Sequence, residues 1–248
     1  MHVLIINGSP RIKKFSNTDM ILKEFTKGMC ENGDTFHLYE ISDKDNWDLI
    51  RKAYDESDNI LIALPLYVEC IPGLLMEFLE TLTPKSGNAK MSFILQSGFS
   101  EGVQLRCGEA YLEKLAGYLG CTYGGTLVKG GNFEIRFLND ENRSKATSPY
   151  AEMGREFSAN GNFASDKCKA FTGPEILPAP VRLLVGFFFK TAVRKRFEKD
   201  AASLGCERHL DYRPYTLDVL RMGRKAQIKK EMILYAAYEL LDEGGIGA

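Results

Sequence analysis

One loop near the start of the chain combines the residue types that bind phosphate groups. Residues 8–18 read Gly-Ser-Pro-Arg-Ile-Lys-Lys-Phe-Ser-Asn-Thr and stand between an apolar run and a helical pattern. The polar side chains belong to Ser9, Ser16, Asn17 and Thr18, and the cations to Arg11, Lys13 and Lys14. At the start of a helix, free N–H groups and the helix dipole also attract an anion. The loop therefore predicts a site for a phosphomonoester.

Part of this loop also has a purely structural interpretation. Ser16 is a suitable helix N-cap, and Asp19 stands three residues later, as in a capping box. That interpretation leaves the three cations unexplained. The GxGxxG and GxxxxGK[ST] fingerprints are both absent, which argues against a Rossmann dinucleotide site and a nucleoside-triphosphate site.

Two later loops also follow apolar runs. Residues 65–72 read Pro-Leu-Tyr-Val-Glu-Cys-Ile-Pro, so Tyr67 could form a wall for a flat ring or could simply cap the core. Residues 96–102 read Gln-Ser-Gly-Phe-Ser-Glu-Gly. Their small residues would let backbone N–H groups approach a ligand closely, although an ordinary connection has the same composition. Taken alone, neither loop decides between its two interpretations.

The elements that must position these loops alternate along the chain. Apolar runs predict strands, and spacing of three to four predicts helices. The strands are expected at residues 2–6, 35–41, 59–64, 91–96 and 121–128, and the helices at 17–29, 48–56, 71–82, 103–119 and 150–159. This alternation predicts an α/β fold, a doubly wound five-stranded parallel sheet of order 2-1-3-4-5. In that order the ends of strands one, three and four meet, so all three loops converge on one crevice.

Together the loops resemble those of flavodoxin-like NAD(P)H-dependent FMN reductases and their quinone- and azo-reductase relatives. The matching segments are residues 8–11, 16–18, 65–67 and 71–75, and the resemblance covers residues 1–160. It implies FMN as cofactor, NADH or NADPH as co-substrate, and a small-molecule electron acceptor such as a quinone. The cofactor-binding residues it implies are Ser9, Arg11, Ser16, Asn17, Thr18, Pro65, Leu66, Tyr67, Val68, Ser97, Gly98 and Phe99. No catalytic side chain is assigned.

Two features depart from these relatives. Met76 stands where relatives often have lysine, and residues 42–47 hold no cysteine where the iron–sulfur members have a cluster. The leading hypothesis is an FMN-dependent oxidoreductase that takes a hydride from NAD(P)H. The alternatives are a flavodoxin-type electron carrier without NAD(P)H turnover and a flavin-free module. Near-neutral charge favours the enzyme, since small carriers usually dock through a strongly charged face.

Composition excludes several other classes. The chain has 248 residues, with 32 Lys and Arg against 33 Asp and Glu, so no global charge attracts nucleic acid. No apolar run is long enough to span a membrane. The first residues lack the basic region of a signal peptide, which indicates a cytoplasmic protein. Six cysteines lie at least 14 residues apart without a CxxC pair, which favours reduced thiols and no metal site.

The last part of the chain differs from the rest. We expect an FMN-binding domain over residues 1–163 and a helical extension over 164–248. Within the extension, residues 181–204 predict a helix that is apolar at its start and basic in its middle, and residues 224–241 predict another. An apolar-then-basic helix resembles membrane-surface helices. Packing against a partner subunit or over the flavin site is favoured here, because aromatic residues suit such interfaces. A homodimer or higher homo-oligomer is expected.

Overall fold

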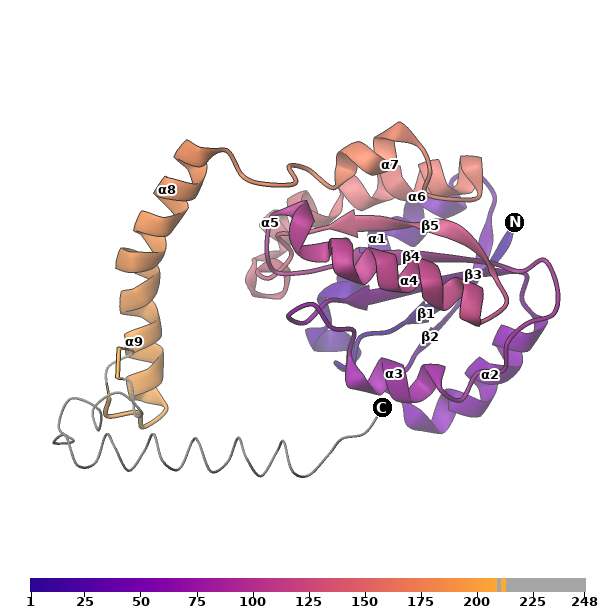
Figure 1. Ribbon diagram of the computed structural model, residues 1–248, viewed down its shortest axis with the longest axis horizontal. Coiled ribbons are helices and arrows are strands. Elements are labelled where there is room, and N and C mark those ends of the chain that lie inside the picture. Colours follow the sequence, from indigo (N-terminus) through magenta and orange to yellow (C-terminus); the bar gives the residue numbers. More distant parts are fainter. Residues whose placement is uncertain (209–210, 213–248) are drawn as a thin grey trace, which may run out of the picture. The chain divides into compact units, whose positions relative to one another are not determined.

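The computed structural model describes residues 1–208, 211 and 212. Strands and helices alternate along the first part of the chain (Figure 1). The strands are β1 (His2–Asn7), β2 (Thr35–Glu40), β3 (Asn59–Pro65), β4 (Lys90–Gln96) and β5 (Thr122–Lys129). The α-helices are α1 (Asn17–Cys30), α2 (Trp47–Glu56), α3 (Gly73–Leu79), α4 (Arg106–Tyr118), α5 (Asp140–Thr147), α6 (Pro149–Asn160), α7 (Asp166–Phe171), α8 (Ala179–Phe188) and α9 (Arg194–Ser203).

The five strands lie parallel in one sheet, in the order β2-β1-β3-β4-β5. β1 pairs with β2 from His2 opposite Thr35, and with β3 from Leu4 opposite Ile60. The chain therefore adds strands on one side of β1 and then on the other, which creates the switch point between β1 and β3. The predicted doubly wound α/β fold is confirmed.

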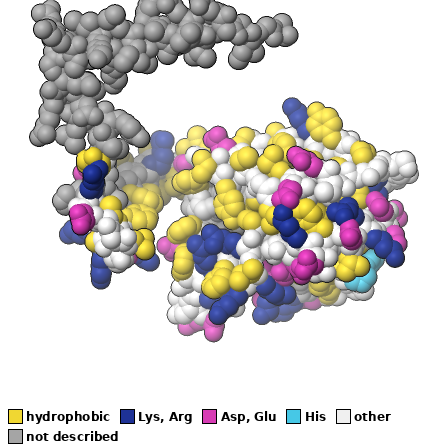
Figure 2. All heavy atoms as spheres, turned by 90° about the horizontal axis from the view of Figure 1, so that it is seen from below, with side chains coloured by type: hydrophobic (Ala, Val, Ile, Leu, Met, Phe, Trp, Pro, Cys, Tyr) yellow, Lys and Arg dark blue, Asp and Glu magenta, His cyan; other side chains and the backbone are white. Residues whose placement is uncertain are grey.

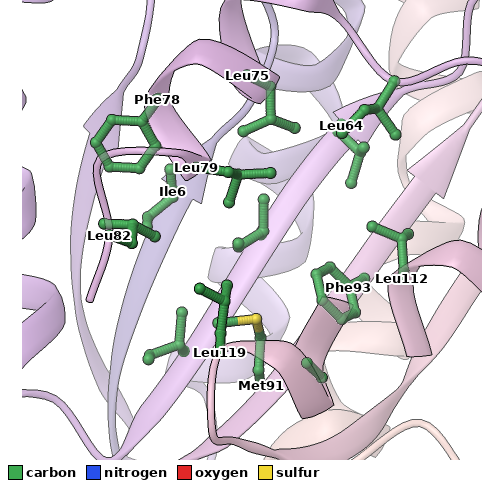
Figure 3. Close-up of a cluster of buried hydrophobic side chains, with 14 of the residues drawn as sticks. Ile6, Leu64, Leu75, Phe78, Leu79, Leu82, Met91, Phe93, Leu112 and Leu119 are labelled. Atoms are coloured by element: carbon green, nitrogen blue, oxygen red, sulfur yellow. The ribbon is translucent and has the colours of Figure 1, made fainter. Parts of the chain in front are cut away.

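Apolar side chains on both faces hold the sheet to its helices. On one face, Leu4 and Ile6 belong to a buried cluster with residues of α2, α3 and α4 (Figure 3). On the other face, Val3 and Ile5 pack with residues of α1 and α6. Successive residues of a strand point to opposite faces. Strands covered on both faces therefore appear in sequence as continuous apolar runs.

The observed helices differ from the predicted ones in five places, one of which is the π-helical turn that divides the helix predicted over 181–204. A short 3₁₀ turn, Gly102–Leu105, replaces the start of the helix predicted from residue 103. The helix predicted over 71–82 is shorter, because α3 begins after Pro72 and ends at Leu79. The helices α5 and α7 were not predicted. Each has one buried residue, Thr147 and Cys168 respectively, and so lacks the apolar stripe that reveals a helix in sequence.

The chain divides into two compact units, Met1–Pro178 and the residues from Ala179 onward. The first unit contains the sheet and also α7, so residues 164–178 belong to it. The second begins with α8, a π-helical turn (Phe189–Val193) and α9. The division after residue 163, the homodimer and the cytoplasmic location stay predictions, and the helix predicted over 224–241 lies outside the described residues.

Candidate functional site

A cavity of about 180 Å³ lies beyond the carboxyl ends of β1, β3 and β4. Its wall comes from the loop after β1, the start of α1, the ends of β3 and β4, and the segment after β5. The lining residues are Ser9, Arg11, Asn17, Thr18, Pro65, Leu66, Tyr67, Gln96, Ser97, Gly98, Phe133 and Arg136. Open α/β sheets bind their ligands at this switch point. The three predicted loops therefore do meet at one cavity.

The start of α1 presents unpaired N–H groups to this cavity. Asn17 and Thr18 line it, and their backbone N–H groups donate to no protein acceptor in the described part of the chain. The N–H of Asp19 donates to the Ser16 Oγ at 3.2 Å, so Ser16 is the helix N-cap. Free N–H groups at the positive end of a helix attract an anion. Ser16 itself is fully buried and lies outside the lining.

Local hydrogen bonds shape the loop between β1 and α1. The Asn7 Oδ1 accepts from the Ser9 N–H at 3.1 Å, and the Ser9 Oγ accepts from the Arg11 N–H at 3.3 Å. These are the turns that short polar side chains form with nearby backbone groups. Together with the Gly8 N–H, which donates to the Ala63 carbonyl of β3 at 2.7 Å, they hold Ser9 and Arg11 at the cavity wall.

Only one of the three cations predicted for phosphate binding lines the cavity. Lys13 instead forms ion pairs with Glu40 at 3.5 Å and with Asp19 at 3.9 Å. Lys14 lies 5.7 Å from the centre of the Phe15 ring. Burial raises the pKa of the Asp19 carboxyl, and the Lys13 charge partly opposes that shift. Lys13 and Lys14 therefore lie outside the cavity lining beside other partners, and a phosphate contact from either one stays a prediction.

The second cavity cation, Arg136, comes from a segment that the sequence did not indicate. The side-chain amide of Asn17 binds that segment through both its nitrogen and its oxygen. The Asn17 Nδ2 donates to the Asn132 carbonyl at 2.7 Å, and its Oδ1 accepts from the Arg136 N–H at 3.1 Å. The guanidinium of Arg136 lies 4.5 Å from the centre of the Phe137 ring. Asn17 therefore joins the α1 start to the segment after β5, which brings Arg136 to the cavity.

A tight turn follows β3 at the edge of the cavity. The Tyr67 N–H donates to the Cys70 carbonyl at 2.8 Å, and the Cys70 N–H donates back to Tyr67 at 3.1 Å. The two residues between them have positive φ, 48° at Val68 and 67° at Glu69. Left-handed backbone costs about 1–2 kcal/mol per non-glycine residue. Val68 is 87% exposed and lies outside the lining, whereas Pro65, Leu66 and Tyr67 form part of it.

The loop after β4 packs closely on the newly identified segment. A Cβ added to Gly98 would lie 3.2 Å from the Phe133 Cβ, so glycine allows this close approach. The Ser97 N–H donates to the Lys129 carbonyl at 3.2 Å. Behind the loop, burial lowers the pKa of the Lys129 ammonium, which donates to the Phe171 carbonyl at 2.8 Å. Phe99 is 62% exposed and does not line the cavity.

Nine of the twelve sequence-predicted residues line the cavity, and the other three are Ser16, Val68 and Phe99. The lining residues Gln96, Phe133 and Arg136 were not predicted. Gln96 directly precedes Ser97 at the end of a predicted strand, so its place at the strand end could have revealed it. Its Nε2 donates to the Thr18 Oγ1 at 3.4 Å. The other two follow β5 without a recognisable motif.

Two kinds of feature are absent from the described residues. No helix is long and apolar enough to cross a membrane. No group of three or more His, Cys, Asp or Glu side chains is placed to hold a metal ion.

Known proteins resemble the chain over the part that contains the cavity loops. Residues 1–131 match the family model described as NADPH-dependent FMN reductase. A Klebsiella pneumoniae protein assigned as a quinone reductase has a similar fold, with TM-score 0.51, 9% identity and coverage of 66% of this chain and 87% of that one. The structure of an FMN-dependent NADH-azoreductase from Bacillus anthracis in complex with FMN has TM-score 0.45 and 15% identity. That match covers 64% of this chain and 100% of the azoreductase chain. A search of curated proteins found no match.

The donors of the cavity suit the phosphate end of FMN. Two arginines and the free N–H groups of α1 face it, and none of its described lining residues is Asp, Glu, His or Cys. Cofactor sites usually measure about 300–1,000 Å³, so a molecule as large as FMN would fill this cavity and extend beyond it. The matched region covers more than half of the chain. The chain therefore belongs to the NADPH-dependent FMN reductase family, and it is an oxidoreductase with FMN as cofactor and NAD(P)H as co-substrate.

Proposed function

We propose that this enzyme passes electrons from NAD(P)H to a small planar aromatic acceptor such as a quinone. FMN, when bound, supplies the redox chemistry by accepting a hydride and delivering electrons. The observation that carries the proposal is the donor set of the cavity, in which two arginines and unpaired helix N–H groups face a space without carboxylates. The role of the protein is to bind and orient FMN and the reacting molecules, and to shield them from solvent.

The phosphate is assigned to the start of α1. Arg11 and Arg136 line the cavity there and supply charge-assisted donors. The free N–H groups of Asn17 and Thr18 supply two more donors. In this proposal Ser9 contributes its hydroxyl to the same group, and Ser16 acts indirectly by capping the helix that carries these N–H groups.

The flavin ring is assigned to the turns after β3 and β4. In the described part of the chain, the N–H groups of Val68, Glu69, Gly98 and Phe99 donate to no protein acceptor. A turn with two left-handed non-glycine residues is a strained arrangement, and such strain concentrates at ligand sites. The role of this strained backbone would be to direct the N–H groups of the turn toward the polar edge of the flavin ring.

The acceptor class follows from the aromatic side chains around the cavity. Tyr67 and Phe133 line it while being 43% and 58% exposed. The Phe137 ring, 62% exposed, lies 5.8 Å from that of Phe133. Exposed rings beside a cofactor site suit stacking with a flat aromatic molecule. A quinone fits this description, and so does the nicotinamide ring that would precede it.

The first test measures FMN binding by the apoprotein. Removing a charge-assisted hydrogen bond typically costs about 1.5–3 kcal/mol, so Arg11→Ala and Arg136→Ala should each raise the Kd for FMN by about 10-fold to 150-fold. Lys13→Ala is the matched control, because Lys13 lies in the same loop but pairs with Glu40. Riboflavin lacks the phosphate, so its Kd should barely change in any of the three variants.

Three results would contradict the proposal. Equal loss of riboflavin and FMN affinity in Arg136→Ala would mean that Arg136 does not bind the phosphate. Anaerobic mixing of the FMN-loaded enzyme with NADH and NADPH tests the reaction itself. FMN that neither nucleotide bleaches would favour a flavodoxin-type carrier, and bleached FMN that a quinone cannot reoxidise would exclude the proposed acceptor.

A further inference from the structure

The first helix of the second unit buries none of its side chains. α8 contains no buried residue, although Arg182 is the one charged residue in its sequence APVRLLVGFF. Leu183, Leu184 and Phe187 are 76%, 68% and 68% exposed. Phe188 and Phe189 follow at 56% and 57%. Burying one such side chain releases about 1.5–3 kcal/mol of free energy. Contact with an apolar partner would therefore stabilise this surface.

The apolar surface of this segment extends around most of the helix. Arg182, Gly186 and Lys190 stand four residues apart, so they share one narrow side. The remaining sides carry Val, Leu and Phe. A helix that packs on one protein surface needs an apolar stripe of only about 100° or more. A helix apolar on nearly all sides fits a medium that surrounds it better than a single facing surface.

The residues that follow carry a concentrated positive charge. Residues 179–203 contain six Lys and Arg against two Asp and Glu, a net charge of +4, while the whole chain has −1. Both acids already form ion pairs within the helix, Glu198 with Arg194 and Asp200 with Arg196. Figure 2 shows these basic side chains on the described part of the second unit, with hydrophobic ones beside them.

The charge selects among the possible partners. A second copy would bring another net +4 against the first, and like charges in contact disfavour pairing. An anionic lipid surface offers the opposite charge next to an apolar layer, and each cation near it adds about 1 kcal/mol of attraction. At 1.5 Å per residue, α8 is about 15 Å long, half the thickness of a hydrocarbon core. It can therefore enter one side of a bilayer without crossing it.

We propose that residues 179–199 dock on the surface of an anionic phospholipid bilayer. α8 and the phenylalanines that end it lie at the boundary of the acyl chains. Lys190, Lys195 and Lys199, which form no ion pair among the described residues, contact the lipid phosphates. The sequence alone favoured a protein partner, and exposure on nearly all sides together with the charge imbalance now favours lipid.

The test uses the full-length, FMN-loaded protein and co-sedimentation with lipid vesicles. Binding is expected to vesicles that contain phosphatidylglycerol, at least about tenfold more weakly to pure phosphatidylcholine, and more weakly at high salt. Replacing Phe187, Phe188 and Phe189 together with serine should abolish binding. Replacing Lys190, Lys195 and Lys199 with glutamine should weaken it at least about tenfold. Tyr118→Ser is the control, because it also replaces an exposed aromatic residue with serine but lies outside the proposed docking segment. Tyr118 belongs to the first unit and is 77% exposed.

Activity with NAD(P)H in vesicle-free buffer shows that each variant is folded, and it should be unchanged. Absence of binding by the active wild-type protein would overturn the proposal. Binding that survives the triple serine variant would overturn the assignment to α8. A dimer that the serine variant converts to a monomer, together with no vesicle binding, would identify a second copy as the partner instead.

Discussion

Phenylalanine has opposite environments in the two units of this protein. Phe78 and Phe93 are fully buried between the sheet and its helices (Figure 3), whereas Phe187 in α8 is 68% exposed. The difference lies in pattern and not in hydrophobicity. Helices such as α3 present one apolar face to a sheet that covers it, while α8 is apolar on most sides. A segment's apolar content therefore does not decide its burial, because burial also requires a matching surface.

Matched truncations test this contrast most strongly. Phe78→Ala removes a fully buried ring and should lower the free energy of unfolding by about 3–5 kcal/mol. Phe187→Ala removes an exposed ring and should change it by less than about 0.5 kcal/mol. Urea denaturation followed by circular dichroism measures both. A large loss from Phe187→Ala would show that α8 is covered by protein in solution.

Two helical glycines sharpen the comparison. A Cβ on Gly28 in α1 would lie 1.8 Å from the Ala151 carbonyl oxygen of α6, and this neighbour is backbone. Gly28→Ala should therefore force the two helices apart and destabilise the first unit by about 1–3 kcal/mol or more.

Gly186 in α8 is the counterpart, because an added Cβ there meets nothing within 4 Å. Alanine is the better helix former by about 0.5–1 kcal/mol. Gly186→Ala should therefore raise the temperature at which α8 loses its helical circular dichroism signal. Circular dichroism melting of both variants gives the comparison. A neutral Gly28→Ala would mean that α1 and α6 are less closely packed than described.

The same comparison explains how much could be predicted from sequence. The sheet order and its helices were predictable, because Val3 to Ile6 and residues 60–64 show the apolar runs of doubly covered strands. The loops at the switch point were predictable because they follow those runs directly. Arg136 was not predictable, because tertiary hydrogen bonds of Asn17, far away in the sequence, place its segment beside the cavity. The ion pair of Lys13 was not predictable either, because its partner Glu40 lies on a neighbouring strand.

A smaller effect than from the buried residues is expected at the end of the first unit, where Glu175 joins the chain to the start of α4. Arg106 donates from its Nε to the Glu175 Oε2 at 3.1 Å, and the Val103 N–H donates to the Glu175 carbonyl at 3.2 Å. The hydrogen bond from Arg106 lowers the pKa of the Glu175 carboxyl. The ion pair is exposed to solvent, so it should contribute no more than about 1 kcal/mol.

Because its pKa is lower in the folded chain, Glu175 contributes its stability above the ordinary carboxyl pKa of 4.5 and loses it as the pH falls through the folded value. Glu175→Gln should therefore reduce the free energy of unfolding by up to about 1 kcal/mol at pH 7. The difference from wild type should shrink as the pH falls below 4.5. Arg106→Gln should remove the same contribution, and the double variant should be no less stable than the less stable of the two. Additive losses would instead mean that the two side chains stabilise this end of the unit through separate contacts, Arg106 then acting through Glu109.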